Sequence, residues 1–176
     1  MKKMLSASRF WLSVAAAIVF LASCATSKKA INPHTYMNKQ YKELKSVLND
    51  AEVSIIKDSV KVIFPNNVLF ASSSDELKEE VKPTFERFAG VLNKYDKTKI
   101  LITGHTDNTG AAAYNRDLSE KRAASAKRLL GSEKVSSDRM FTWGLSDRDP
   151  IAGNDTEAGK ARNRRVEFVI LYDVKQ

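Results

Sequence analysis

The sequence predicts an α/β (α+β) domain built as a two-layer sandwich, with helices packed on a mixed four-stranded sheet. Short apolar runs typical of strands alternate with longer segments of helical periodicity. Of the 176 residues, 43% are hydrophobic and 28% are charged, the balance of an ordinary globular domain of about 100 to 150 residues. The chain contains one cysteine, so an intramolecular disulfide framework is excluded.

Residues 1–23 have the layout of a secretory signal peptide. Three basic residues and no acidic residue accompany an uncharged apolar run of 12 residues, 10–21. A helix that spans a bilayer needs about 20 such residues, so we expect this segment to be removed. A retained signal anchor is the alternative.

The apolar run ends in Leu21-Ala22-Ser23-Cys24, which resembles the bacterial lipoprotein box. In that motif, two small residues precede a cysteine that receives a lipid through a thioether before cleavage. We therefore expect Cys24 to be the acylated first residue of the mature protein, with fatty acids such as palmitate; a stray cysteine is the alternative. Several acyl chains give stable anchoring, and Ala25 in place of Asp favours the outer membrane under the enterobacterial sorting rule.

Residues 24–51 are predicted to be a tether that contains a short helix. Residues 25–36 show no periodicity, whereas apolar residues over 37–48 follow helical spacing. The basic excess lies in these N-terminal segments, because the chain from Ala51 onward holds 21 basic and 19 acidic residues. A domain with so balanced a charge is poorly suited to nucleic acid, and we expect no nucleic-acid partner.

The folded domain is expected over residues 52–176. Alternating apolar residues predict a hairpin over 53–64, and capping residues before a periodic segment predict a long helix from about residue 75 to 95, kinked at Pro83. A strand over 99–103 leads through a polar loop to a second helix, which Gly131 closes. The remaining predicted elements are a strand at 139–143, a loop at 147–156, a helical turn at 157–163 and a last strand at 165–172.

The residue inventory argues against an enzyme. His34 lies in the predicted tether and His105 in a loop, and the common hydrolase, metalloprotease and phosphate-loop motifs are absent. His105 and Asp107 supply two metal ligands, whereas a catalytic zinc needs three from the protein. We expect no catalysis, metal or cofactor; a periplasmic hydrolase using His105 and Asp107 is the alternative.

Two polar segments are candidates for ligand binding. The loop 103–110, Thr-Gly-His-Thr-Asp-Asn-Thr-Gly, lies between a strand end and a helix start, where backbone N–H groups can hold an anion. Alternatively, Asp107 and Asn108 merely cap the helix. The cluster Arg162-Asn-Arg-Arg165 opens a strand, and its guanidinium groups suit either a phosphate or buried carboxylates.

Six blocks of sequence stand in the order and spacing of the OmpA C-terminal-like family, which the chain resembles over about residues 60–171. The blocks are residues 103–110, 114–123, 138–140, 144, 150–154 and 163–167. Together with the lipoprotein box, they are similar to the peptidoglycan-associated (Pal) type of that family, which lacks a preceding β-barrel.

The resemblance implies non-covalent binding of peptidoglycan through the diaminopimelate of its stem peptide. In the family, the Asp of the Thr-Asp-x-x-Gly loop and the Arg of Leu-Ser-x-x-Arg-Ala hold the zwitterionic end of diaminopimelate, and they fall here on Asp107 and Arg122. The other matching positions that line or support the groove are Thr106, Asn115, Leu118, Phe70 and Arg165. After Phe70 the chain has Ala-Ser-Ser-Ser, where many relatives carry Asp or Asn, so one wall of the groove departs from the family.

The sequence thus predicts a lipid-anchored bacterial outer-membrane protein whose periplasmic domain ties that membrane to the cell wall. The expected partners are peptidoglycan and, through the anchor, the membrane. The alternative is an adaptor whose main partner is another envelope protein, as in a Tol-Pal complex.

Overall fold

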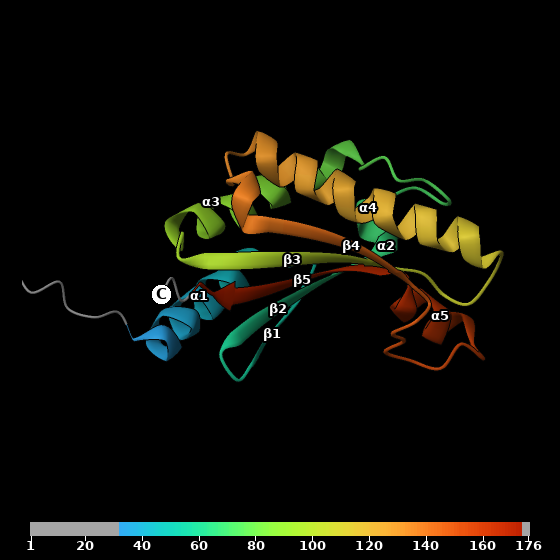
Figure 1. Ribbon diagram of the computed structural model, residues 1–176, viewed down its shortest axis with the longest axis horizontal. Helices are drawn as coiled ribbons and strands as arrows, with labels where there is room; N and C mark the ends of the chain where they lie inside the picture. Colours follow the sequence, from blue (N-terminus) through green and yellow to red (C-terminus); the bar gives the residue numbers. More distant parts are fainter. Residues whose placement is uncertain (1–31, 174–176) are drawn as a thin grey trace, which may run out of the picture. The chain divides into compact units, whose positions relative to one another are not determined.

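The computed structural model describes residues 32–173 (Figure 1). The predicted signal peptide, the lipoprotein box with Cys24 and residues 25–31 lie outside the described residues. Among the described residues, no helix is both long and apolar enough to cross a bilayer. No three His, Cys, Asp or Glu residues in this part of the chain are grouped as metal ligands would be.

The sheet is mixed and has five strands in the order β1-β2-β5-β3-β4. All neighbours are antiparallel except β3 and β4, which run parallel. The α+β class is confirmed, but the expected count of four strands is corrected to five, because both arms of the predicted hairpin join the sheet. The strands are β1 (Glu52–Ile56), β2 (Ser59–Pro65), β3 (Thr98–His105), β4 (Met140–Ser146) and β5 (Arg165–Tyr172).

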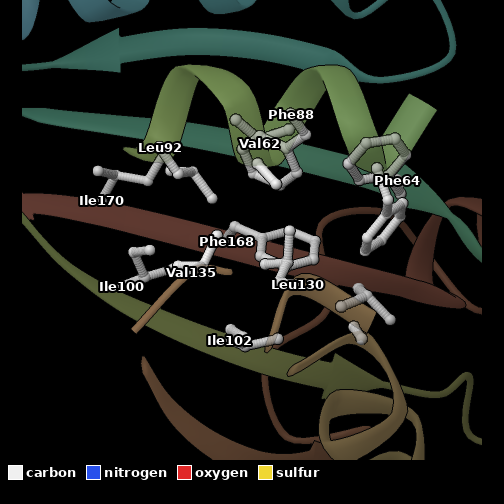
Figure 2. Packing of buried hydrophobic residues seen from close by; sticks show 14 of the residues in the cluster. Val62, Phe64, Phe88, Leu92, Ile100, Ile102, Leu130, Val135, Phe168 and Ile170 are labelled. Carbon is white, nitrogen blue, oxygen red and sulfur yellow. The ribbon is translucent and has the colours of Figure 1, made fainter. Parts of the chain in front are cut away.

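Of the five α-helices in the described part of the chain, α3 and α4 lie over the same face of the sheet (Figure 1). The helices are α1 (Pro33–Val47), α2 (Asn66–Leu69), α3 (Lys82–Lys94), α4 (Ala112–Ser132) and α5 (Glu157–Asn163). Alternate side chains of β2 are buried, as the period of two of a strand requires, whereas residues 102–105 of β3 and 165–168 of β5 are buried on both faces. Phe64, Phe88 and Phe168 meet at the centre of this layer, where the rings of Phe88 and Phe168 pack edge to face with centroids 5.1 Å apart (Figure 2).

The helix expected within the tether is part of the folded unit. The side chain of Asn32 accepts a hydrogen bond from the backbone N–H of Thr35, so α1 begins with a cap and with Pro33 in its first turn. Met37 and Leu44 are completely buried in the common core. The described residues 32–173 accordingly lie in one compact unit, which includes twenty residues before the expected boundary at residue 52.

Helix α3 begins later than the helix predicted from about residue 75. The helix begins at Lys82, and Pro83 occupies its first turn, where a missing N–H costs no hydrogen bond and no kink follows. Upstream, Phe70 and Leu77 form an antiparallel bridge, so residues 71–76 make a loop, and only a turn of 3-10 helix, Glu79–Val81, precedes α3. That loop forms one wall of the pocket described next.

Candidate ligand-binding pocket

A pocket of about 520 Å³ lies at the end of the sheet where β3 finishes and β5 starts. Its walls come from α2 with the loop that follows, from the β3–α4 loop, from α4 and from the residue before β5. The lining residues are Asn66, Asn67, Phe70, Ala71, Ser72, Ser73, Lys78, Thr106, Asp107, Thr109, Tyr114, Asn115, Leu118, Arg122 and Arg164.

Asp107 is held as a buried carboxylate. Its Oδ1 accepts a hydrogen bond of 2.9 Å from the backbone N–H of Thr109, and its Oδ2 accepts one of 2.5 Å from Nη1 of Arg164. Burial raises the pKa of Asp107, but the hydrogen bonds from Arg164 and Thr109 outweigh it and hold that pKa below its ordinary value. The side chain is therefore ionised at neutral pH.

The capping explanation for this loop does not apply. Helix α4 starts at Ala112, and its cap residue Ala111 makes no side-chain hydrogen bond. Asp107 instead bonds to Thr109 within the loop, which then turns at Gly110 with a φ of 96°, a conformation that favours glycine. Asn115 secures the loop by donating from Nδ2 to the carbonyl of Thr109 at 2.9 Å.

Arg122 is 3% exposed and lies in the same pocket. Its Nε donates to the carbonyl of Ser74 at 2.9 Å, and its guanidinium lies 5.3 Å from the centroid of the Phe70 ring. Burial lowers the pKa of Arg122, yet an arginine remains charged at any physiological pH. Within the described part of the chain, its two Nη groups have no hydrogen-bond partner.

The structure brings six of the seven predicted binding residues into this pocket. Phe70 and Leu118 form apolar walls, and the hydroxyl of Thr106 is buried without a hydrogen-bond partner. Asp107 and Arg122 share the pocket but do not bond to each other, since the partner of Asp107 is Arg164. The pocket therefore holds a paired anion beside a cation whose outer nitrogens are available.

Arg165 is the seventh predicted residue, and it does not line this pocket. It is 1% exposed, donates to the carbonyl of Asp149 at 3.1 Å and lies 3.5 Å from the carboxylate of Glu167. Its neighbour Arg164 reaches the pocket instead. Successive side chains at the start of a strand point to opposite faces of the sheet. The positions of the two arginines in the sequence could therefore have indicated that only one of them reaches the pocket.

The wall that departs from the family is formed by Ala71, Ser72 and Ser73, which carry no carboxylate or amide. Amide side chains reach the pocket from Asn66 and Asn67 of α2 instead. The Oδ1 atom of Asn66 is buried without a hydrogen-bond partner. Sequence reasoning missed these two residues, although the Asn-Asn pair was visible after Pro65.

His105 does not join Asp107 in the pocket. Its Nε2 lies 3.0 Å from the hydroxyl of Thr103, and burial lowers the pKa of His105 to about 4. The imidazole is neutral at physiological pH and is 1% exposed. The hydrolase alternative thus has no histidine facing the pocket.

The profile of the OmpA family matches residues 69–164, a range that contains every lining residue except Asn66 and Asn67. The chain belongs to the OmpA family. This confirms the family to which the sequence blocks pointed.

Two curated relatives and one solved structure illustrate the similarity. The probable lipoprotein YiaD of Escherichia coli is 39% identical over 137 residues, which cover 77% of this chain and 63% of YiaD, less than two thirds of its length. The outer-membrane lipoprotein YfiB of Pseudomonas aeruginosa is 29% identical over 159 residues, 90% of each chain. The structure of the peptidoglycan-associated lipoprotein from Burkholderia pseudomallei aligns with a TM-score of 0.54 and 31% identity, over 58% of this chain and 87% of that one.

Proposed function

We propose that this OmpA-family chain is an envelope lipoprotein whose domain binds peptidoglycan non-covalently and ties the outer membrane to the wall. The observation that carries the proposal is the presence in one pocket of a buried carboxylate, Asp107, and a buried guanidinium, Arg122, whose two Nη groups have no hydrogen-bond partner among the described residues. A guanidinium that lines a pocket and keeps free N–H donors there is suited to bind an anionic group of a ligand. Among its similar proteins are lipoproteins and a peptidoglycan-associated lipoprotein.

The ligand that fits this pair is the free end of diaminopimelate, which carries an ammonium and a carboxylate on one carbon. The ammonium would bind Asp107, and the carboxylate would bind the Nη groups of Arg122. Each charge-assisted hydrogen bond contributes about 1.5 to 3 kcal/mol. Phe70 and Leu118 would contact the aliphatic chain of the ligand, and the buried hydroxyl of Thr106 would gain a partner.

Arg164 does not block this arrangement. A carboxylate has about four acceptor positions, and the hydrogen bonds in the free structure come from Arg164 and Thr109. An ammonium can therefore bind Asp107 beside Arg164. No step in this account breaks or forms a covalent bond, so we propose no catalytic role.

The position of the pocket suits a tether. Tyr36 of α1 accepts a hydrogen bond from the backbone N–H of Lys97, just before β3 begins, whereas the pocket lies where β3 ends. The eight residues of β3 separate these points by roughly 23 Å. If Cys24 carries the lipid, the seven residues 25–31 could span at most about 25 Å. The pocket therefore lies at the end of β3 remote from the contact that Tyr36 of α1 makes.

The test is a pull-down of the purified protein on insoluble peptidoglycan that contains diaminopimelate. We expect the wild type to sediment with the wall and Asp107→Asn to remain in the supernatant, because the amide keeps the shape but loses the charge. Asp117→Asn is the matched control: it removes an exposed carboxylate of α4 that pairs with Lys121 outside the pocket. Equal sedimentation of Asp107→Asn and the wild type would contradict the proposal.

Attachment of the protein has its own test. Replacing Cys24 by Ser removes the only thiol in the chain, so no thioether lipid can form. The variant should lose fatty-acid labelling and membrane association while it retains wall binding. Unchanged labelling of Cys24→Ser would refute the anchor, and it would leave the pocket assignment standing.

A further inference from the structure

The charged side chains that line the pocket do not balance. Arg122, Arg164 and Lys78 are cationic, and Asp107 is the single anion among the lining residues. The free end of diaminopimelate carries one positive and one negative charge, so its binding to Asp107 and Arg122 leaves the excess of two positive charges unchanged. A pocket of this kind is complementary to a ligand with further negative charge.

Arg164 is placed to meet such a charge. Its side chain is 35% exposed, compared with 9% for Asp107, so it lies at the mouth while Asp107 lies deeper. Its backbone carbonyl accepts a hydrogen bond of 2.9 Å from the N–H of Asn66, which fixes the residue next to α2. Only Nη1 is engaged by Asp107 among the described residues, and a guanidinium has five N–H donors.

Lys78 lines the same pocket and, like Arg164, lies next to α2. Its Nζ donates to the carbonyl of Asn67 at 2.6 Å, which leaves two of the three ammonium hydrogens for other acceptors. The pocket thus offers further cationic donors, from Arg164 and Lys78, besides Arg122. A carboxylate next to the diaminopimelate end would meet one or both of them.

We propose that Arg164 binds a second carboxylate of the stem peptide, so that the pocket recognises two carboxylates and one ammonium. This inference rests on the proposed function and specifies its ligand further. Two carboxylates of a stem tetrapeptide are close enough in sequence: the α-carboxylate of the glutamate before diaminopimelate and the C-terminal carboxylate of the alanine after it. Both present the same planar acceptor to the guanidinium.

A simpler role for Arg164 makes a different prediction. If Arg164 only neutralised Asp107 in the free protein, its removal would change the affinity for all stem peptides by the same factor. If Arg164 contacts a second carboxylate, its removal would matter only for peptides that carry that carboxylate. The difference between the two roles is a coupling between a protein change and a ligand change.

The experiment is a double-mutant cycle measured by calorimetric titration of the purified protein. Three synthetic tetrapeptides are compared: one with both carboxylates free, one with the glutamate carboxylate amidated and one with the C-terminus amidated. We expect the wild type to lose about tenfold or more in affinity for one of the amidated peptides. Which peptide shows the loss identifies the source of the carboxylate.

In Arg164→Gln, the free and amidated peptides should bind with affinities within about twofold of each other. Arg164→Lys keeps the charge without the forked geometry and should retain part of the discrimination. Arg162→Gln is the matched control, because Arg162 belongs to the same basic cluster but lies outside this pocket, and it should discriminate like the wild type.

Wild-type protein that binds all three peptides equally would overturn the inference, and so would Arg164→Gln that still discriminates like the wild type. In either case the proposed function survives, because the peptides bind. Failure of the wild type to bind any of the three peptides would contradict the proposed function itself and this inference with it.

Discussion

Two buried arginines at different places in the fold show how structural and binding roles differ. Arg139, which is 9% exposed, donates to three backbone carbonyls, those of Leu92, Tyr95 and Thr98, at 2.8 to 3.0 Å. It also donates to the hydroxyl of Thr98 at 2.8 Å. Arg122, which is 3% exposed, makes one hydrogen bond within the described residues, to the carbonyl of Ser74.

The difference is the number of satisfied donors, not the degree of burial. Arg139 secures the carbonyl end of α3 to the start of β3, so its hydrogen bonds stabilise the fold. Arg122 is also largely removed from water, but its two Nη groups have no partner among the described residues. Such free donors in a pocket suit the binding of a ligand. This comparison predicts that replacing Arg139 affects mainly stability and replacing Arg122 affects mainly binding.

The largest effect is expected for Arg139→Ala. The substitution removes four hydrogen bonds to buried or helix-end acceptors, so the free energy of unfolding should fall by about 3 kcal/mol. Denaturant unfolding of the purified protein measures this value. Arg116→Ala, at an exposed position of α4, is the control and should change stability by less than about 0.5 kcal/mol. A loss for Arg139→Ala as small as that of the control would invalidate the comparison.

Arg122→Ala should reduce the affinity for stem peptide by roughly tenfold to a hundredfold, because the ligand carboxylate loses its charged donor. The free energy of unfolding should change far less than in Arg139→Ala. Arg122→Lys should restore little affinity, since an ammonium cannot make a two-pronged contact. The combination of titration and unfolding separates the two roles; a variant that binds normally but unfolds easily would reverse our assignment.

A smaller effect is expected from His105 on the pH dependence of the free energy of unfolding. Burial lowers the pKa of His105 from 6.5 to about 4, so between these values the unfolded chain takes up a proton that the folded chain does not. The contribution of the neutral His105 to the free energy of unfolding is fully present above pH 6.5 and is lost as the pH falls toward 4. Between pH 7 and 5.5 the loss should be about 1 kcal/mol, above the range in which carboxylates titrate.

His105→Gln provides the comparison for this prediction. The variant has no group that titrates at this position, so its stability should vary less with pH over the same interval than that of the wild type. Only the slopes of the free energy of unfolding against pH are compared, because the substitution itself alters packing at a buried site. Parallel slopes for the two proteins would show that His105 takes up its proton in the folded state as well.

Much of the fold could be predicted from local sequence. The bounds of β5 and α5 match the expectations at 165–172 and 157–163, because a β-branched run and a capped turn carry strong local signals. The start of α3 and the packing of α1 could not be predicted in this way. They depend on the Phe70–Leu77 bridge and on burial of Met37 and Leu44, which are long-range contacts.

The candidate site, too, could be predicted only in part from the sequence. Family motifs pointed to Asp107 and Arg122, and the structure places both in one pocket although fifteen residues separate them. The same motifs did not distinguish Arg164 from Arg165. Arg164 is the residue before β5 and pairs with Asp107, while Arg165 is the first residue of β5 and lies against the buried Glu167.

The central claim is that the pocket binds the zwitterionic end of diaminopimelate. Its most direct test is calorimetric titration of the purified protein with two stem peptides that differ at one residue, diaminopimelate in one and lysine in the other. Lysine keeps an ammonium but lacks the second carboxylate, so Arg122 would have no partner. We expect the diaminopimelate peptide to bind at least about tenfold more tightly and free diaminopimelate to compete with it. Equal affinity for the two peptides would contradict the account.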